Sequence, residues 1–157
     1  MTDIPSFGVA MGEGAEFDAI RRMIEIWGPD IAGGLGDDAG AFVAPRGERM
    51  LASTDASVEG VHFRRDWLTP REIGARATAA AMSDLAAMSA MPIGLLLALG
   101  LPEEWRSDLD EIAAGVGALA VLMECTIIGG NITRARELSL TITVLGASIA
   151  PLFRFAA

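Results

Sequence analysis

Lysine is missing from this chain of 157 residues, whose twelve basic side chains are all arginine. Walker P-loops and protein kinases each place a lysine ammonium on the nucleotide phosphates, so the sequence excludes both classes of nucleotide enzyme. Any phosphate chemistry must then rely on metal ions, backbone amides or arginine. A GC-rich genome would also produce a lysine-poor composition, so the absence restricts the chemistry without establishing one.

Histidine and cysteine are nearly as scarce, with one of each. A zinc site usually needs several nitrogen or sulfur ligands, so the composition argues against zinc. Cys125 has no partner for a disulfide and lies in an apolar run, which is typical of a core residue. Residues 1–5 have neither the basic start nor the apolar stretch of a secretory signal. We therefore expect a cytoplasmic protein.

Long hydrophobic runs are also missing, although 52% of the residues are hydrophobic. The densest runs, 91–101 and 112–123, are shorter than the roughly 20 residues that cross a bilayer. We expect no membrane span and a single soluble domain over residues 1–157. The formal net charge of −9 argues against non-specific binding to nucleic acid or anionic membranes, and it favours cations as partners.

Helical patterns occur in three segments, which span residues 16–27, 69–90 and 107–123. Thr69 is a typical N-cap and Pro70 suits the first helical position. Ser107 is a similar cap, followed by acidic residues in the first turn, where they complement the helix dipole.

Strand patterns are short and scattered among the helices, at residues 39–43, 50–55, 92–101, 126–128 and 138–144. The glycines that follow the fourth of these, Gly129 and Gly130, predict a turn. Apolar and polar residues alternate over 138–144, which predicts a half-buried strand. This order favours an α+β layer with helices on one face of a sheet, and a βαβα arrangement is the alternative.

Aspartates cluster where these elements end, at Asp37, Asp38, Asp55 and Asp84. Magnesium takes hard oxygen ligands and needs neither histidine nor cysteine, so this inventory suits it. For Asp37 and Asp38 the alternative is an Asx turn after the glycines. Asp84 lies between apolar residues of a predicted helix, so we expect its carboxylate to be either partnered or functional.

Four motifs, in this order and spacing, resemble thiamine-monophosphate kinase, a family of the aminoimidazole ribonucleotide synthetase superfamily. They are Gly-Leu-Gly-Asp-Asp-Ala at 34–39, the segment 53–63 with Ser-Thr-Asp at its start, Ser-Asp-Leu-Ala-Ala-Met at 83–88 and Gly-Gly-Asn-Ile-Thr at 129–133. Members of that superfamily use ATP without a P-loop. The resemblance implies an α+β fold with a mixed, largely antiparallel sheet and helices packed on one face.

The resemblance also implies roles for individual residues. Magnesium positions of the family are matched by Asp38, Ser53, Thr54, Asp55 and Asp84. Positions that contact ATP are matched by Gly129, Gly130, Asn131 and Arg154, and Asn131 stands where the family usually has a metal-binding aspartate. His62 matches a substrate-side position, for which the alternative is an ordinary polar surface residue.

The activity implied is ATP-dependent phosphorylation of thiamine monophosphate to thiamine diphosphate, by magnesium-assisted in-line transfer in a homodimer. Relatives carry a carboxy-terminal domain that we expect this chain to lack, so the alternative is a catalytically incomplete fragment that binds nucleotide and dimerises. The alternating segment 138–144 is a candidate for the dimer contact, unless it is an inner strand. Selenophosphate synthetase, another member of the superfamily, is disfavoured because the chain has no lysine or cysteine near its start.

Overall fold

The computed structural model describes residues 14–33, 35 and 39–148. Its helices and strands, in chain order, are α1 (Ala15–Trp27), β1 (Arg49–Val58), α2 (Pro70–Ala87), β2 (Met91–Leu101), the 3₁₀ helix η1 (Glu103–Asp108), α3 (Leu109–Leu122), β3 (Thr126–Arg134) and β4 (Ser139–Ser148). None of the described helices is both long and apolar enough to cross a bilayer. Asp37, Asp38 and Arg154 lie outside the described residues.

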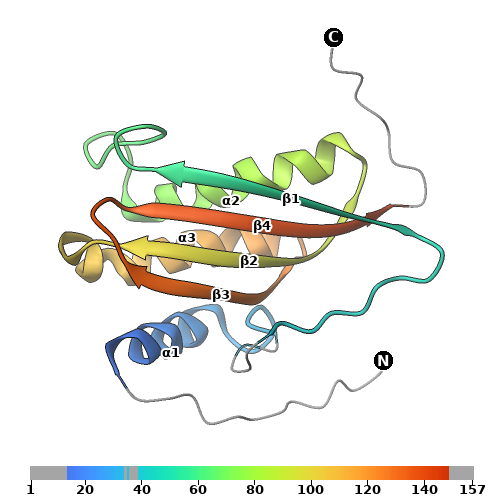
Figure 1. Ribbon diagram of the computed structural model, residues 1–157, viewed down its shortest axis with the longest axis horizontal. Coiled ribbons are helices and arrows are strands. Elements are labelled where there is room, and N and C mark those ends of the chain that lie inside the picture. Colours follow the sequence, from blue (N-terminus) through green and yellow to red (C-terminus); the bar gives the residue numbers. More distant parts are fainter. Residues whose placement is uncertain (1–13, 34, 36–38, 149–157) are drawn as a thin grey trace.

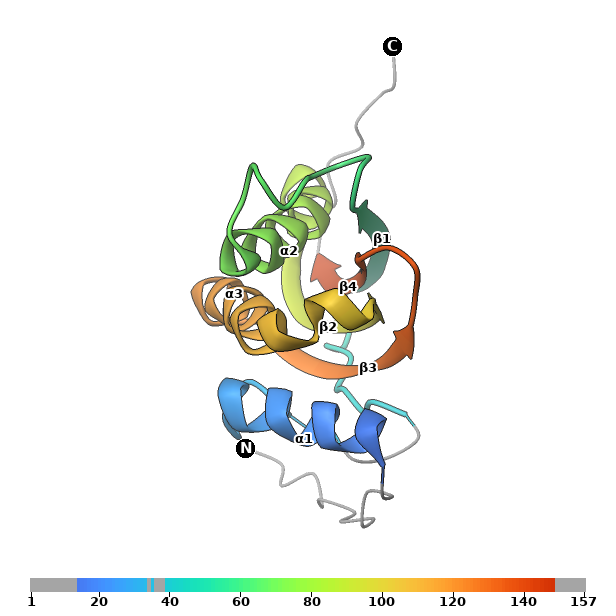
Figure 2. The same cartoon turned by 90° about the vertical axis from the view of Figure 1, so that its left-hand side faces the viewer.

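The strands form one mixed sheet in the order β1-β4-β2-β3. The strand β4 runs antiparallel to both β1 and β2, whereas β2 and β3 are parallel and are joined through α3. Helices α2 and α3 lie against one face, and α1 lies beside the β3 edge (Figure 1 and Figure 2). The expected α+β layer with a largely antiparallel sheet is therefore confirmed, and βαβα order is limited to the β2-α3-β3 unit.

The core lies between the sheet and its helices, and the alternation in β4 shows which face is covered. Leu140, Ile142 and Val144 are fully buried, whereas the neighbouring Thr141 and Thr143 are half-exposed on the other face, which we call the open face. The predicted half-buried strand is confirmed. Since β4 is hydrogen-bonded to β1 on one side and β2 on the other, it has no free edge to pair with a second copy.

Local signals placed the start of the long helix α2 correctly, although the helix ends at Ala87 rather than at the expected residue 90. The Thr69 hydroxyl accepts a hydrogen bond from the Glu72 N–H at 3.3 Å, and the Glu72 carboxylate accepts from the Thr69 N–H at 2.8 Å. This reciprocal capping box satisfies two N–H groups that the first turn leaves without helical partners. These hydrogen bonds hold the pKa of Glu72 below its ordinary value, because they favour the charged carboxylate.

The expected strand at 39–43 is not formed. Its residues Ala41, Phe42 and Val43 are all exposed, so the segment has no buried face that would hold it in the sheet. The expected helix cap at Ser107 is also wrong, because Ser107 lies inside η1 and α3 begins two residues later.

The predicted turn at Gly129 and Gly130 is wrong as well, because β3 continues through both glycines to Arg134. Pairing with Leu96 and Leu97 of β2 keeps the segment extended. At Gly130 the neighbouring backbone is so close that an added Cβ would lie 2.1 Å from the Leu97 carbonyl oxygen. These glycines therefore allow close strand packing rather than a change of chain direction.

Cys125 is buried in the core, as its apolar surroundings predicted. Burial raises the pKa of its thiol to about 11. Because the thiolate is the reactive form, the side chain is a poor nucleophile at neutral pH.

Candidate metal and nucleotide site

Ser53 and Asp84, two of the predicted magnesium ligands, meet at the β1 edge of the sheet. The Ser53 hydroxyl donates a hydrogen bond to the Asp84 carboxylate, with 2.5 Å between the oxygens, although the residues are 31 positions apart in sequence. Ser53 points from β1 toward the helices, and Asp84 lies in the last turn of α2. Of the two alternatives expected for Asp84, a partnered or a functional carboxylate, the structure shows the first.

Asp55 lies on the same face of β1 as Ser53, because side chains two positions apart in a strand point the same way. It is half-buried and sits in register with Ile142, whose side chain is part of the core beneath the helices. No described arginine forms an ion pair with Asp55 or Asp84. Both carboxylates are therefore free of cationic side chains among the described residues and could accept a metal ion.

The donor set of Ser53, Asp55 and Asp84 fits magnesium in chemical type, since all its side-chain donors are hard oxygens. It is incomplete, because no three acidic, histidine or cysteine side chains come together among the described residues. Water and substrate phosphates usually complete a magnesium shell. Asp38, the remaining predicted carboxylate ligand, lies outside the described residues.

Thr54 is placed differently from its neighbours. Its side chain lies on the open face, where its hydroxyl shares a hydrogen bond of 2.8 Å with the hydroxyl of Thr143. The side chain therefore cannot join Ser53 and Asp84 across the sheet. If Thr54 contributes to the same ion, the ligand must be its backbone carbonyl.

Asn131 is also on the open face, in a cross-strand row with Ala98 and Thr141. Three strand spacings, or about 14 Å, separate the β3 position of Asn131 from the β1 position of Asp55. Their side chains also project from opposite faces. The predicted ligand set is thus divided into two groups that cannot share one ion within one chain.

His62 lies in the loop that follows β1. Its Nδ1 accepts a hydrogen bond of 3.1 Å from the backbone N–H of Val58, and the side chain is exposed. That bond requires Nδ1 to be unprotonated, so in the neutral ring the proton is on Nε2. The loop therefore presents a hydrogen-bond donor to solvent near the C-terminal end of β1.

The loop after β1 is held in place by contacts of Glu59 and Arg65 with Trp105, which we call the clamp. Sequence reasoning gave these residues no role. The carboxylate of Glu59 accepts a hydrogen bond of 2.8 Å from the indole N–H of Trp105 and a longer one of 3.4 Å from the backbone N–H of Leu138. Arg65 stacks on the Trp105 ring at 4.1 Å and forms an ion pair with Asp108. The presence of Glu59 within the second motif was the only sequence signal for this clamp.

Comparison with known proteins agrees with this architecture. Residues 36–148 match the family described as AIR synthase related protein, N-terminal domain. The thiamine-monophosphate kinase of Synechococcus elongatus is 43% identical over 112 residues, which cover 71% of this chain and 34% of that protein. The solved thiamine-monophosphate kinase from Stenotrophomonas maltophilia K279a is similar with a TM-score of 0.67 and 35% identity, covering 83% of this chain and 40% of that one.

A further solved structure, AaThiL complexed with AMPPCP and TMP, matches with a TM-score of 0.67 and 28% identity, covering 89% of this chain and 43% of that one. The chain thus spans less than half the length of each of these relatives. The resemblance expected from the four motifs is confirmed, since the family match includes three of the motifs in full and most of the first. Together with the observed mixed sheet, it shows that this chain belongs to the AIR synthase related protein family and contains that family's N-terminal domain.

Proposed function

We propose that this chain forms the nucleotide-binding part of a magnesium-dependent kinase that transfers a phosphoryl group from ATP to thiamine monophosphate. The contact between Ser53 and Asp84 supports this proposal most directly. It joins two segments that were assigned to the same metal site from separate motifs. The relative that binds AMPPCP, an ATP analogue, together with TMP supports the assignment of both substrates.

In this proposal Asp84 and Asp55 hold magnesium at the β1 edge, with Ser53 fixing the orientation of the Asp84 carboxylate. When bound, magnesium would neutralise the phosphate charge and align the attacking and leaving oxygens. The acceptor needs no strong base, because a phosphate monoester with a second pKa of about 6 is largely ionised at neutral pH. This suits a site without lysine.

Asn131 is assigned to a second site, on the open face, together with its neighbours Gly129 and Gly130. In this second site ATP would be bound through a magnesium ion other than the one held by Asp84. An amide oxygen can coordinate magnesium but carries no negative charge. His62 is assigned to the thiamine monophosphate side, where its Nε2–H could donate to a phosphate oxygen. Arg154 is assigned to the nucleotide phosphates on the resemblance alone.

Changing Asp84 to Asn tests the metal assignment. The amide keeps the size of the side chain and can still accept the Ser53 hydrogen bond, but it removes a negative charge that magnesium needs. We expect magnesium-dependent ATP binding, measured by titration calorimetry, to weaken at least about tenfold, or about 1.4 kcal/mol. Asp55→Asn should have the same effect, while the melting temperature changes little.

The matched control is Asp18→Asn on α1, beyond the opposite edge of the sheet, where the carboxylate forms an exposed ion pair with Arg21. This variant should bind Mg·ATP as the unchanged chain does. Equal affinities for the Asp84 variant and the control would contradict the proposal.

A second candidate function follows from the length of the chain, which spans 34% to 43% of the relatives named above. In this alternative the chain binds nucleotide but does not complete the reaction. Both alternatives require Mg·ATP binding, so they are separated by a coupled assay for thiamine diphosphate. Thiamine diphosphate formed by the purified chain would rule out the alternative in which the chain only binds nucleotide. Mg·ATP binding without thiamine diphosphate would support that alternative.

We further infer that the open face of the sheet is a homodimer contact. On β1, β4 and β2 its described positions carry no charged side chain, and they include Met50, Ala52, Thr54, Ala56, Leu96, Ala98, Ser139, Thr141, Thr143 and Leu145. In a chain with 21% charged residues, a strand surface without any charge is unusual for a solvated face and typical of a covered one. A second copy offers the same uncharged face.

Ala98→Arg is expected to produce monomers. The variant places a guanidinium at the centre of this face, and dimerisation would bury that charge against an uncharged surface without a partner. Light scattering coupled to gel filtration should then report 16.4 kDa, against about twice that mass for the unchanged chain. Ala118→Arg, at an exposed position of α3, is the control and should leave the mass unchanged. A monomeric unchanged chain would contradict the dimer.

A further inference from the structure

A cavity of about 290 Å³ lies at the β3 edge of the sheet, between α1, η1 and the end of β3. Its lining comes from five elements, α1, β2, η1, α3 and β3, and consists of Ala15, Glu16, Ala19, Leu101, Arg106, Leu109, Ile132, Thr133 and Arg134. None of these residues belongs to the proposed metal, nucleotide or substrate groups. The function assigned above therefore leaves the cavity without a role.

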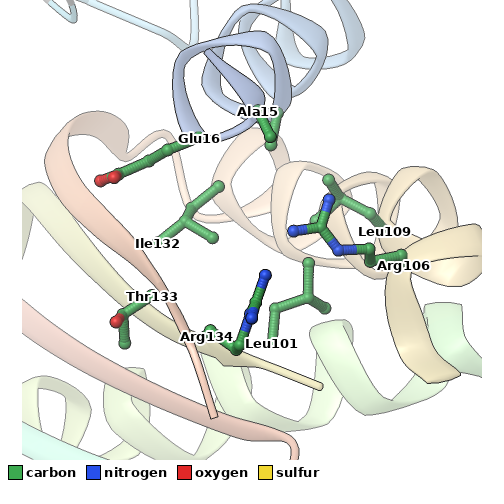
Figure 3. A pocket seen from close by; sticks show the side chains of 9 residues that line it. Ala15, Glu16, Leu101, Arg106, Leu109, Ile132, Thr133 and Arg134 are labelled. Atoms are coloured by element: carbon green, nitrogen blue, oxygen red, sulfur yellow. The ribbon is translucent and has the colours of Figure 1, made fainter. Parts of the chain in front are cut away.

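Two arginines determine the electrostatics of this cavity. Figure 3 shows Arg106 and Arg134 reaching from η1 and β3 toward the same space, while Glu16 extends away from both. Arg106 is held by Glu103 through its Nε, at 2.9 Å, and its terminal nitrogens remain for other contacts. Arg134 has no ion pair with any described residue. Guanidinium groups are planar and carry several N–H donors, so two of them facing one space suit an oxyanion.

The wall behind the arginines is apolar and rigid. Leu101, Leu109 and Ile132 contribute to it and are each less than 10% exposed, so they are fixed by the surrounding core. The first turn of α1 adds Ala15 to this wall, but it also carries the carboxylates of Glu16 and Asp18, so the attraction for an anion comes from the two arginines. Charge on one side and hydrocarbon on the other define an amphipathic site.

We propose that this cavity binds a small phosphate monoester or carboxylate that carries a compact apolar group. The anionic group would lie between Arg106 and Arg134, and the apolar group against Leu101 and Ile132. The volume of about 290 Å³ is just below the range of about 300–1,000 Å³ for small-molecule sites, so the ligand is smaller than a nucleotide. This proposal is independent of the kinase assignment, which concerns the β1 edge and the open face.

Phenyl phosphate is a suitable probe, because it combines both groups and is small. We expect it to bind the full chain saturably in titration calorimetry with EDTA present, which removes magnesium from the Asp84 group. Inorganic phosphate, which has only the anionic group, and benzyl alcohol, which has only the apolar group, should each bind at least tenfold more weakly. Arg134→Gln should weaken phenyl phosphate binding at least tenfold, and Arg106→Gln should do the same.

Arg136→Gln is the matched control, since it removes the same charge from an exposed position two residues further along the chain and outside the cavity. It should leave phenyl phosphate binding unchanged, and circular dichroism should show all three variants folded. Absence of phenyl phosphate binding, or an equal loss in the Arg134 and Arg136 variants, would overturn the site. Neither result would alter Mg·ATP binding, so failure here is distinguishable from failure of the kinase assignment.

Discussion

Replacing Trp105 by alanine is expected to lower the free energy of unfolding by about 4 kcal/mol, within the range of large-to-small substitutions of buried aromatic residues. The Trp105 side chain is 1% exposed and packs in the main core. Its removal would leave a cavity and would also take the hydrogen-bond donor from Glu59. Chemical denaturation followed by circular dichroism measures this loss.

Trp67→Ala provides the same chemical change at an exposed site, since Trp67 is 62% exposed. It should cost less than about 1 kcal/mol. Trp105→Phe keeps a six-membered ring in the core but removes the N–H together with part of the indole; we expect a loss of about 2 kcal/mol, smaller than that of the alanine variant. Similar losses for the two alanine variants would show that Trp105 does not anchor the loop after β1.

Gly115→Ala is the second substitution with a large expected effect. Helices α2 and α3 touch at this point, and an added Cβ would lie 2.0 Å from the carbonyl oxygen of Arg71 and 2.8 Å from the backbone nitrogen of Ala75. Both neighbours are backbone atoms, so the helices would have to move apart. We expect a loss of about 2–3 kcal/mol from this overpacking, measured as a lower melting temperature.

The direction in which the stability changes distinguishes steric overpacking from helix propensity. In a helix without such a contact, glycine to alanine stabilises by about 1 kcal/mol through helix propensity alone. Ala118→Gly, on the exposed side of α3, should show that propensity cost without any steric effect. An unchanged or higher melting temperature for Gly115→Ala would contradict the close helix contact. Gly74 supports that contact from the α2 side, because a Cβ added there would lie 2.2 Å from the Ile112 carbonyl oxygen.

Elements whose signals are local could be predicted from the sequence. Thr69, Pro70 and Glu72 specify the start of α2 through contacts within one helical turn. The alternation over 138–144 identified the buried face of β4 because that pattern depends only on the pleat of the strand. The turn predicted at Gly129 was wrong because β2, over thirty residues earlier in the chain, supplies the pairing that keeps β3 extended.

In the candidate site, too, features set by neighbouring residues could be predicted, whereas features set by residues far apart in sequence could not. The position of Asp84 between apolar residues predicted that it is either partnered or functional, but it could not indicate Ser53, because the sheet alone brings β1 beneath α2. The face on which Asn131 lies was also not predictable. A β-bulge between Leu95 and Leu96 shifts the register of the β2-β3 pair, and a shift of one residue changes the face of every later side chain.

The position of β1 in the sheet has a consequence for the order in which the protein folds. Its only strand neighbour among the described residues is β4, and the paired residues Thr54 and Thr143 are 89 positions apart in the chain. Closing so long a loop is entropically costly and slow, so β1 must wait for β4 before it can join the sheet. During synthesis, Ser53 and Asp55 therefore leave the ribosome long before β4 is available. The carboxylates assigned to magnesium would be among the last parts of the molecule to reach their final positions.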